Sequence, residues 1–344
     1  MIENFALNVL GCVGANGKCV TLCCDRNLNG PGTALGETAE ETVENFRRER
    51  ANVIAESIKF ESLNNSSAMD EERNFTAECA KCTNYQVGDF GKFDGLIHYV
   101  NLSMYPAPCQ CKCFYCDFRD GKAGVFDNRL HADYHEKMLN VLDYVKNKGL
   151  VAADAVWQVS SGEITIHPFK NRIFMLVENQ TAVFYTNCFI FEEKVAQNLA
   201  VNPRSSINLS IDSGTPETWY KVKGVDNFGA VMENLAKYHD SSAQDGQVTL
   251  KYIVLPGTND NLNDYLSVVE IMKNLKIKHL TLSYDTRVKY TQSSREKENL
   301  ISAAAYLVAI LYKNGRTFDI FRDAPKMYER VVARAAKLVQ IGKI

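Results

Sequence analysis

The eleven cysteines of this 344-residue chain are its residues best suited to metal chemistry. Ten of them lie between Cys12 and Cys116, and only Cys188 lies beyond. Inert core thiols would not gather so strongly in one part of a sequence. The chain shows no basic-then-apolar signal segment and no apolar run of about 18 residues, so we expect a cytoplasmic protein without a membrane anchor. In a reducing compartment, clustered cysteines favour metal or redox chemistry over disulfides.

Three of these cysteines have a spacing that suits an iron–sulfur cluster. Cys109, Cys113 and Cys116 form a C-x3-C-x2-C pattern after a strand-like run at residues 96–102. Three thiolates on one short loop are able to hold three irons of a cubane cluster and leave the fourth iron open to a ligand. Cys111 is an extra cysteine in the loop, but no set that includes it fits the spacing. A zinc knuckle is the alternative, although structural zinc usually takes paired C-x2-C elements and four ligands.

This segment resembles the cluster loop of the radical S-adenosylmethionine (radical SAM) superfamily, in its spacing, in the aromatic Tyr115 and in its place after a first strand. The resemblance implies a [4Fe–4S] cluster on Cys109, Cys113 and Cys116, whose open iron chelates S-adenosylmethionine. Reductive cleavage of that cofactor then yields a 5′-deoxyadenosyl radical, which abstracts hydrogen from a substrate. Tyr115 would pack near the cluster and the adenine. A flavodoxin or ferredoxin is the implied reductant.

A second segment strengthens the resemblance. Ser161, Gly162 and Glu163 follow the second predicted strand and are similar to the family's Gly-Gly-Glu motif, with Ser161 in place of the first glycine. By this resemblance the backbone groups and the acid hold the methionine ammonium of the cofactor. An ordinary strand-end turn with a solvated glutamate is the alternative.

Later strands supply further candidates. Ser210 and Asp212 alternate along the fourth predicted strand, so we expect them to share one face. Similar segments of the family contact the ribose and carboxylate of the cofactor, and Leu255 begins a turn that resembles the segment whose backbone meets adenine. Cys188 ends the third predicted strand and is a candidate hydrogen donor to a substrate radical, although a lone strand cysteine is more often a small core residue.

These side chains require a parallel sheet to position them. Strands are expected at residues 96–102, 155–160, 182–188, 207–212, 248–255 and 279–284. Helices are expected at residues 130–148, 169–178, 191–201, 228–239, 262–275, 295–313 and 326–339. Repeated strand-then-helix units imply a parallel sheet with ligands at the C-terminal ends of its strands. The predicted fold class is therefore α/β, a partial (β/α)6 radical SAM barrel preceded by a small cysteine-rich hairpin/helix module.

The N-terminal cysteines form a second group. Asn16 and Gly17 separate two strand-like runs and predict a hairpin, because both residues tolerate positive φ. If the turn spans residues 15–18, three of the hairpin cysteines project from one face. A helix is expected at residues 37–58. The arrangement resembles a SPASM or twitch-type module, which holds auxiliary iron–sulfur clusters, although such modules usually follow the radical SAM domain.

The ligands of this auxiliary site are less sharply defined. The best single set is Cys12, Cys23, Cys79 and Cys82, with Cys19 and Cys24 as alternates. A hairpin with a distant C-x2-C pair is also how a zinc ribbon is built, so zinc stays open beside iron–sulfur. An auxiliary cluster would be able to accept an electron from a substrate radical, which would make the enzyme an oxidoreductase.

The whole chain is expected to have three parts, namely an auxiliary module at 1–94, a radical SAM core at 95–290 and C-terminal helices at 291–344. The formal net charge of −2 gives no overall basic field, so neither nucleic acid nor a membrane is expected as a partner. The expected substrate is a peptide or a sugar, and the cofactor is either consumed or recycled. The rival is a non-catalytic zinc- or iron–sulfur-stabilised binding protein, which predicts no turnover of S-adenosylmethionine.

Overall fold

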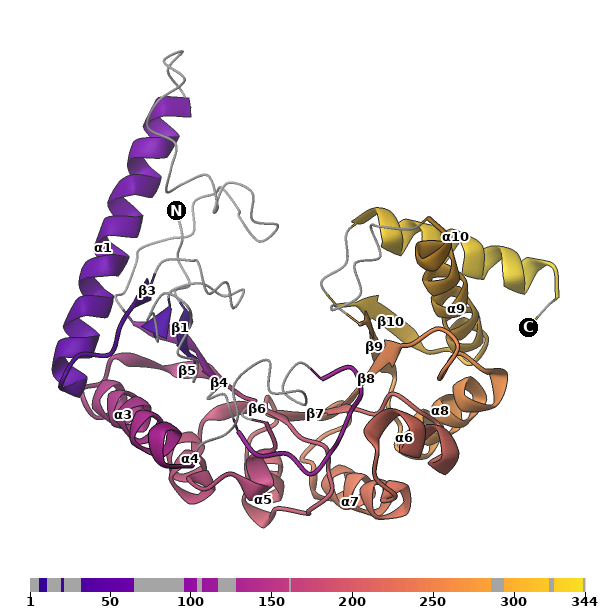
Figure 1. Ribbon diagram of the computed structural model, residues 1–344, viewed down its shortest axis with the longest axis horizontal. Helices are drawn as coiled ribbons and strands as arrows, with labels where there is room; N and C mark the ends of the chain where they lie inside the picture. The colour runs from indigo at the N-terminus through magenta and orange to yellow at the C-terminus, as the bar shows by residue number, and fades with distance from the viewer. Residues whose placement is uncertain are drawn as a thin grey trace. The chain divides into compact units, whose positions relative to one another are not determined.

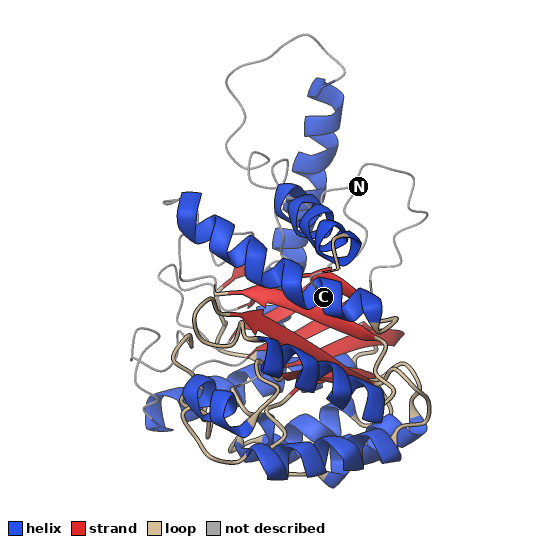
Figure 2. Ribbon diagram, turned by 90° about the vertical axis from the view of Figure 1, so that its right-hand side faces the viewer, coloured by secondary structure: helices blue, strands red, loops and turns tan. Residues whose placement is uncertain are grey.

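The computed structural model describes residues 6–10, 20–21, 32–64, 96–103, 107–116, 128–160, 162–285, 294–321, 325–342 and 344. The chain divides into two compact units, and in both of them strands alternate with helices (Figures 1 and 2). The first unit consists of Met1–Ala107, Phe126–Gly162 and His167–Ala182. The second consists of Pro108–Val125, Glu163–Ile166 and Val183–Ile344.

The first unit is built around parallel strands. Its elements are β1 (Ala6–Leu10), β2 (Val20–Thr21), β3 (Gly32–Thr33), α1 (Ala39–Asn64), β4 (Ile97–Ser103), α3 (Asn128–Asn147), β5 (Val151–Val159) and α4 (Lys170–Val177). Strand β4 pairs in parallel with both β1 and β5. The core includes Leu102 of β4, Trp157 of β5 and Met138 of α3, all fully buried.

The predicted N-terminal hairpin is present as an antiparallel pairing of β1 with β2. Its register differs from the one that a turn at residues 15–18 would give, because Asn8 lies opposite Thr21 rather than Asp25. Strand β1 is described to Leu10 and β2 from Val20, and the predicted Asn-Gly turn lies outside the described residues. The pairing of β1 with β4 was not expected from the sequence.

The second unit carries most of the chemistry-bearing residues. Its elements are η1 (Ile164–Ile166), β6 (Thr181–Tyr185), α5 (Glu193–Val201), β7 (Ser206–Ser210), α6 (Pro216–Lys223), α7 (Phe228–Ser241), β8 (Val248–Val254), α8 (Leu262–Asn274), β9 (His279–Tyr284), α9 (Ser294–Lys313), β10 (Thr317–Ile320) and α10 (Pro325–Gln340). The strands follow the order β6–β7–β8–β9–β10, and every neighbouring pair is parallel. Figure 1 shows α5, α7 and α8 outside these strands.

The two faces of β7–β10 differ in polarity. One face is apolar and buried, and its residues include Leu209, Leu250, Leu280 and Phe318. The alternate positions are polar and mostly half-buried, with the in-register row Ser210, Lys251, Thr281 and Asp319 and the hydrogen-bonded pair Asn208 and Thr249. Parallel sheets are usually apolar on both faces. A polar second face is therefore a surface suited to a polar ligand.

The predicted α/β class and the strand–helix alternation are confirmed. Strand β10 is an addition, since the sequence suggested only helices after residue 291. It is four residues long and pairs in parallel with β9. Among the helices that the structure describes, none is long and apolar enough to cross a membrane. The predicted three-part domain division stays a prediction.

Candidate functional site

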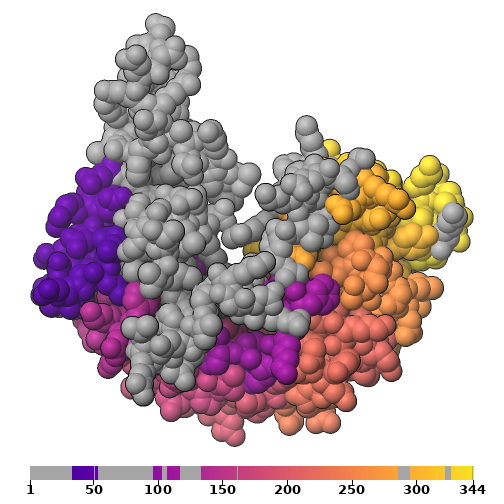
Figure 3. Space-filling model, viewed as in Figure 1, coloured from indigo at the N-terminus to yellow at the C-terminus, as the bar shows by residue number. Residues whose placement is uncertain are grey.

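The cysteine loop is anchored to the end of helix α6. The N–H groups of Lys112 and Phe114 donate to the carbonyls of Lys223 and Val222, at 2.7 and 3.3 Å. The last carbonyls of a helix have no partner within the helix, so the loop supplies donors that the helix end lacks. A turn bond of 3.1 Å from Cys116 N–H to the Cys113 carbonyl brings these two residues together. Violet atoms of this segment reach the surface of the molecule in Figure 3.

Gly224 allows this close approach. It ends α6 in the left-handed conformation, with φ of 69°. A Cβ atom at this position would lie 2.9 Å from the Cβ of Lys112 and 3.1 Å from its carbonyl oxygen. Glycine adopts this conformation without the strain that a side chain adds. The absence of a side chain at Gly224 thus lets the end of α6 pack directly against the cysteine loop.

Three of the four cysteine thiols of the loop lie close to one another. Cys109 is exposed, whereas Cys111, Cys113 and Cys116 are half-buried, and none of these four is in a disulfide. The Cys111 thiol is hydrogen-bonded to both Cys109 and Cys113. This hydrogen bond is the main reason that the pKa of Cys109 is lowered and that of Cys113 falls to about 6. Lys223 lowers the pKa of Cys113 further. The thiolate, which these shifts favour, is the form that binds metal.

Behind the thiols lies a buried polar triad of Tyr115, Asp212 and Lys223. The Lys223 Nζ is 2.5 Å from Asp212 Oδ2 and 2.8 Å from the Tyr115 hydroxyl, which donates to the same carboxylate oxygen at 2.5 Å. Burial lowers the pKa of Lys223, but Asp212 and Cys113 more than offset it, so the net pKa is raised. Burial, and then Asp212, raise the pKa of Tyr115. The triad couples the cysteine loop to the end of β7 and to α6.

Asp212 is held in a strained backbone conformation. Its φ is 50°, which is uncommon for a residue with a side chain. Its Oδ1 accepts from Ile253 N–H at 2.7 Å, and its carbonyl accepts from Asn259 Nδ2 at 2.8 Å. Because β7 ends at Ser210, the alternation expected for Ser210 and Asp212 does not continue to Asp212. Ser210 is half-buried and Asp212 fully buried.

Glu163 is fully buried and satisfied by several donors. Its Oε1 accepts from Thr165 N–H and Oγ1 and from Thr186 Oγ1, at 2.9 to 3.1 Å, and its Oε2 accepts from Asn187 N–H at 2.6 Å. Burial raises its pKa, while these donors oppose the rise. Its own N–H donates to the Pro108 carbonyl at 2.9 Å, next to Cys109. Glu163 thus holds the start of the cysteine loop and the end of β6 together.

The remaining candidates occupy different settings. Gly162 has φ of 58°, and Ser161 lies outside the described residues. Leu255 packs its side chain in a cluster with Phe114 and Tyr115, while its N–H donates to Asn259 Oδ1. Its backbone N–H is therefore already used within its own turn.

Cys188 is fully buried and has φ of 57°. Burial, together with Glu163, raises the pKa of its thiol, so the neutral form is favoured. Its carbonyl accepts from Asn234 Nδ2 at 2.9 Å. The ligand set proposed for an auxiliary site, Cys12, Cys23, Cys79 and Cys82, lies outside the described residues, as do Cys19 and Cys24.

The donors present fit a thiolate-bound iron–sulfur cluster. Three of the four thiols of the loop have the C-x3-C-x2-C spacing, and Gln110 in the same loop has a buried Nε2 without a hydrogen-bond partner in the described structure. Within the described ranges, no three acidic, histidine or cysteine side chains meet around a point where a single ion would sit. Each thiolate ligand of a cubane binds a different iron, so the ligands are spread around the cluster rather than around one ion.

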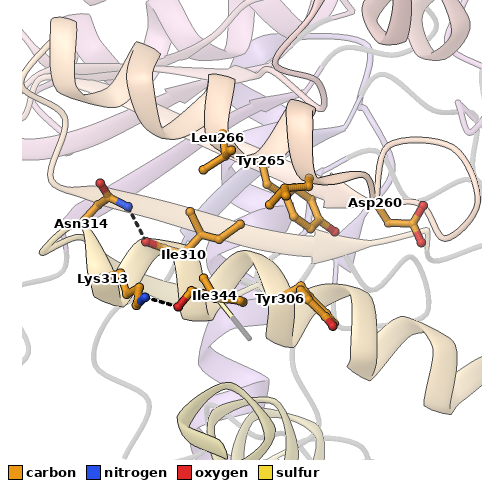
Figure 4. A pocket seen from close by; sticks show the side chains of 9 residues that line it. Asp260, Tyr265, Leu266, Tyr306, Ile310, Lys313, Asn314 and Ile344 are labelled. Atoms are coloured by element: carbon orange, nitrogen blue, oxygen red, sulfur yellow. Dashed lines mark hydrogen bonds between the residues drawn. The ribbon is translucent and has the colours of Figure 1, made fainter. Parts of the chain in front are cut away.

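A separate pocket of about 460 Å³ lies between α8 and α9 (Figure 4). Its walls include Tyr265 and Leu266 of α8 and Tyr306 and Ile310 of α9. Lys313 donates to the carbonyl of Ile344 at one side of it. None of the residues predicted for the cofactor site lines this pocket.

Sequence reasoning assigned no role at the site to Lys223, Asn187 or Asn259. Each acts on a residue far away in the chain, as when Lys223 contacts Tyr115 108 positions earlier. The clearest local signal was that Lys223 directly precedes Gly224, at the helix end that receives the loop. A contact across such a distance has no spacing pattern of its own.

Two solved structures are similar to parts of this chain. The chain is similar to Streptococcus suis SuiB bound to S-adenosylmethionine, with a TM-score of 0.48 and 12% identity over 70% of this chain and 53% of SuiB. It is also similar to anSMEcpe with bound AdoMet, with a TM-score of 0.47 and 16% identity over 64% of this chain and 63% of that one.

The chain thus spans about half of SuiB and less than two thirds of anSMEcpe. No curated protein matches it. The family profile described as "Radical SAM superfamily" matches residues 108–269, a little under half of the chain. That match begins one residue before Cys109 and includes Tyr115, Glu163, Asp212 and Lys223. The sequence similarity to the radical SAM superfamily therefore covers residues 108–269.

Proposed function

We propose that this chain is a radical SAM enzyme that binds a [4Fe–4S] cluster through Cys109, Cys113 and Cys116 and acts on a polar substrate. The observation that carries the proposal is the coupling of the cysteine loop to the Tyr115–Asp212–Lys223 triad, because cluster ligands and buried charges then belong to one site. When bound, the cluster and S-adenosylmethionine supply a 5′-deoxyadenosyl radical that abstracts hydrogen from a substrate.

The chain's own residues divide the work of holding that cofactor. Lys223 carries a positive charge beside the loop, which suits the carboxylate end of S-adenosylmethionine. Tyr115 and Leu255 contribute apolar surface near the thiols, as adenine requires. Gly162 and Glu163, with Ser161, are proposed for the methionine ammonium, and Ser210 and Asp212 for the ribose and carboxylate. Glu163 and Asp212 also set the positions of the segments around them.

A peptide or a sugar is the proposed substrate. The polar face of β7–β10 supports this, because a ladder of hydroxyl, amide and charged groups is suited to hydrogen-bonding a polar molecule. Lys251, whose Nζ lies 4.4 Å from the centre of the Phe321 ring, places a cation on that face. Cys188 stays a candidate hydrogen donor to a substrate radical, since its thiol is held in the neutral form.

Three further parts of the proposal concern segments or partners beyond this site. An auxiliary iron–sulfur cluster on Cys12, Cys23, Cys79 and Cys82, or a zinc ion there, is proposed from the cysteine pattern. With such a cluster the net reaction is an oxidation. A flavodoxin or ferredoxin is the proposed electron donor.

The test is release of 5′-deoxyadenosine from S-adenosylmethionine by anaerobically reconstituted protein with dithionite. We expect release by the wild type and none by Cys113→Ala, which lacks one cluster ligand. Cys111→Ala is the matched control, because it removes a thiol from the same loop but not from the ligand set, and bound iron keeps its ligand thiols deprotonated without the hydrogen bonds of Cys111. It should keep the iron and the activity.

Two results would argue against the proposal. Equal release by Cys113→Ala and wild type would exclude the assigned ligands. A fully loaded, reducible cluster that never cleaves S-adenosylmethionine, with or without candidate peptides and sugars, would favour the rival, a cluster-stabilised binding protein.

A further inference from the structure

Asn187, at the end of β6, lies against the cysteine loop in a well-defined orientation. Its Oδ1 accepts from the Phe189 N–H at 3.0 Å. Because this bond fixes which side of the amide carries oxygen, the Nδ2 group must face the other way. There it donates to Gln110 Oε1 at 3.0 Å and lies 3.7 Å from the sulfur atoms of both Cys109 and Cys111.

The backbone of Asn187 is fixed as firmly as its side chain. Its N–H donates to Glu163 Oε2 at 2.6 Å, and Glu163 N–H donates to the carbonyl of Pro108. The contacts form a closed circuit from the start of the loop through Glu163 to Asn187 and back to Cys109. Because both the backbone and the side-chain oxygen of Asn187 are held by hydrogen bonds, its Nδ2 group stays directed at the sulfur atoms of Cys109 and Cys111.

From this geometry we infer that Asn187 is a positioning residue that tunes the reduction potential of the cluster on Cys109, Cys113 and Cys116. The inference rests on the proposed function, which supplies the cluster. One-electron reduction adds negative charge to the cluster and its thiolates. A hydrogen bond donated to a ligand sulfur stabilises that added charge, so it raises the potential and makes reduction easier.

The isosteric variant Asn187→Asp reverses the local polarity, because it changes the donor and the charge together. The carboxylate keeps an oxygen for the Phe189 N–H but replaces the donor facing Cys109 with a negative charge. We expect the ratio of reduced to oxidised cluster at a fixed potential to fall about tenfold, which is about 59 mV for a one-electron couple. An anaerobic redox titration followed by electron paramagnetic resonance measures this, alongside the iron content.

The chain offers a closely matched control in Asn202→Asp. Asn202 makes the same local turn, because its Oδ1 accepts from the N–H two residues on, at Arg204, and it stands at the C-terminal end of helix α5. In this variant the ratio of reduced to oxidised cluster at that potential should stay within about twofold of the wild-type ratio. Asn187→Ser is a second test, since its hydroxyl retains an acceptor but is too short to reach the sulfurs, and it should shift the potential in the same direction by less.

The outcomes separate this inference from the proposed function. Wild-type potentials in iron-loaded Asn187→Asp and Asn187→Ser would overturn the inference alone. So would loss of iron from both while Asn202→Asp retains it, because Asn187 would then only shape the loop. A wild type without a [4Fe–4S] cluster, or a Cys113→Ala variant that binds it normally, would instead overturn the proposed function.

Discussion

At the scale of single residues, the buried charges of Lys223 and Asp212 depend on each other. Asp212 is fully buried and the Lys223 side chain is 4% exposed. Lys223→Met leaves a buried carboxylate without its ammonium, and Asp212→Asn leaves the ammonium without its carboxylate. Each single change should lower the free energy of unfolding by about 3–5 kcal/mol. Urea denaturation measures this.

The double variant completes the test of the pair. With both charges gone, neither is left unpaired, so Lys223→Met with Asp212→Asn should be clearly more stable than the sum of the two single losses predicts. Losses that simply add would mean that the two side chains act independently. Both single variants should also weaken binding of S-adenosylmethionine, because each disrupts the triad with Tyr115.

His167 gives the first unit a dependence on pH. Burial, and then His135, lower its pKa to about 3, against about 6.5 in an unfolded chain. Below pH 6.5 the unfolded chain therefore takes up a proton that the folded chain refuses. Stability should fall as the pH drops from about 6.5 to about 3, by up to about 1.4 kcal/mol per pH unit.

The variant His167→Gln removes this titrating group and should flatten the acid limb of the stability curve, measured by denaturation at several pH values. An unchanged slope in His167→Gln would contradict the assignment to His167.

The residues that sequence reasoning identified are those whose signal is local. Cys109, Cys113 and Cys116 lie within eight positions, and Tyr115 lies between them, so their spacing is visible in the sequence. Asn187 acts on the cysteine loop across 78 positions, which no spacing records. The positive φ of Asp212 was also hidden, because a strand pattern at residues 207–212 assumes that alternation continues to its end.

At the scale of elements, the end of α6 and the cysteine loop form one unit of structure through Gly224. Gly224→Ala places a side chain at φ of 69° and within 2.9 Å of Lys112 Cβ. The left-handed conformation alone costs about 1–2 kcal/mol for a residue other than glycine. The close contact with Lys112 would also push the cysteine loop away from the helix end. We therefore expect lower iron content after reconstitution as well as lower stability.

Gly315→Ala is the control for this prediction. Gly315 has φ of 64°, but a Cβ there meets nothing within 4 Å. The backbone strain is therefore similar while the contact with the loop is absent. Gly315→Ala should lose stability and keep its iron, whereas equal iron content in the two variants would mean that Gly224 does not position the loop.

Elements were predictable where their periodicity is long. The strand at residues 279–284 matches β9, and the helix at 262–275 matches α8 within one residue. Strand β10 was missed because four residues with a single deeply buried side chain, Phe318, give almost no pattern. Its place is set by pairing with β9, which is a contact between segments rather than a property of the segment itself.

At the scale of the whole molecule, the distribution of cysteines predicts two separate metal sites. The four cysteines of the loop lie in residues 108–125 of the second compact unit, whereas the proposed auxiliary ligands fall within Met1–Ala107 of the first. Ligands contributed by different parts of the chain should load independently. Each [4Fe–4S] cluster would contribute about four irons per chain.

Two sets of variants separate the sites. Replacing Cys79 and Cys82 with serine should remove about four of about eight irons and leave the electron paramagnetic resonance signal of the cluster on Cys109, Cys113 and Cys116. Replacing those three cysteines with alanine should do the reverse, and Cys188→Ala should change neither count. If the Cys79 and Cys82 variant loses one zinc and no iron, the first site is a zinc ribbon. Full iron content in the Cys79 and Cys82 variant would exclude these cysteines as cluster ligands, because two lost thiolates leave two irons of a cubane without a protein ligand.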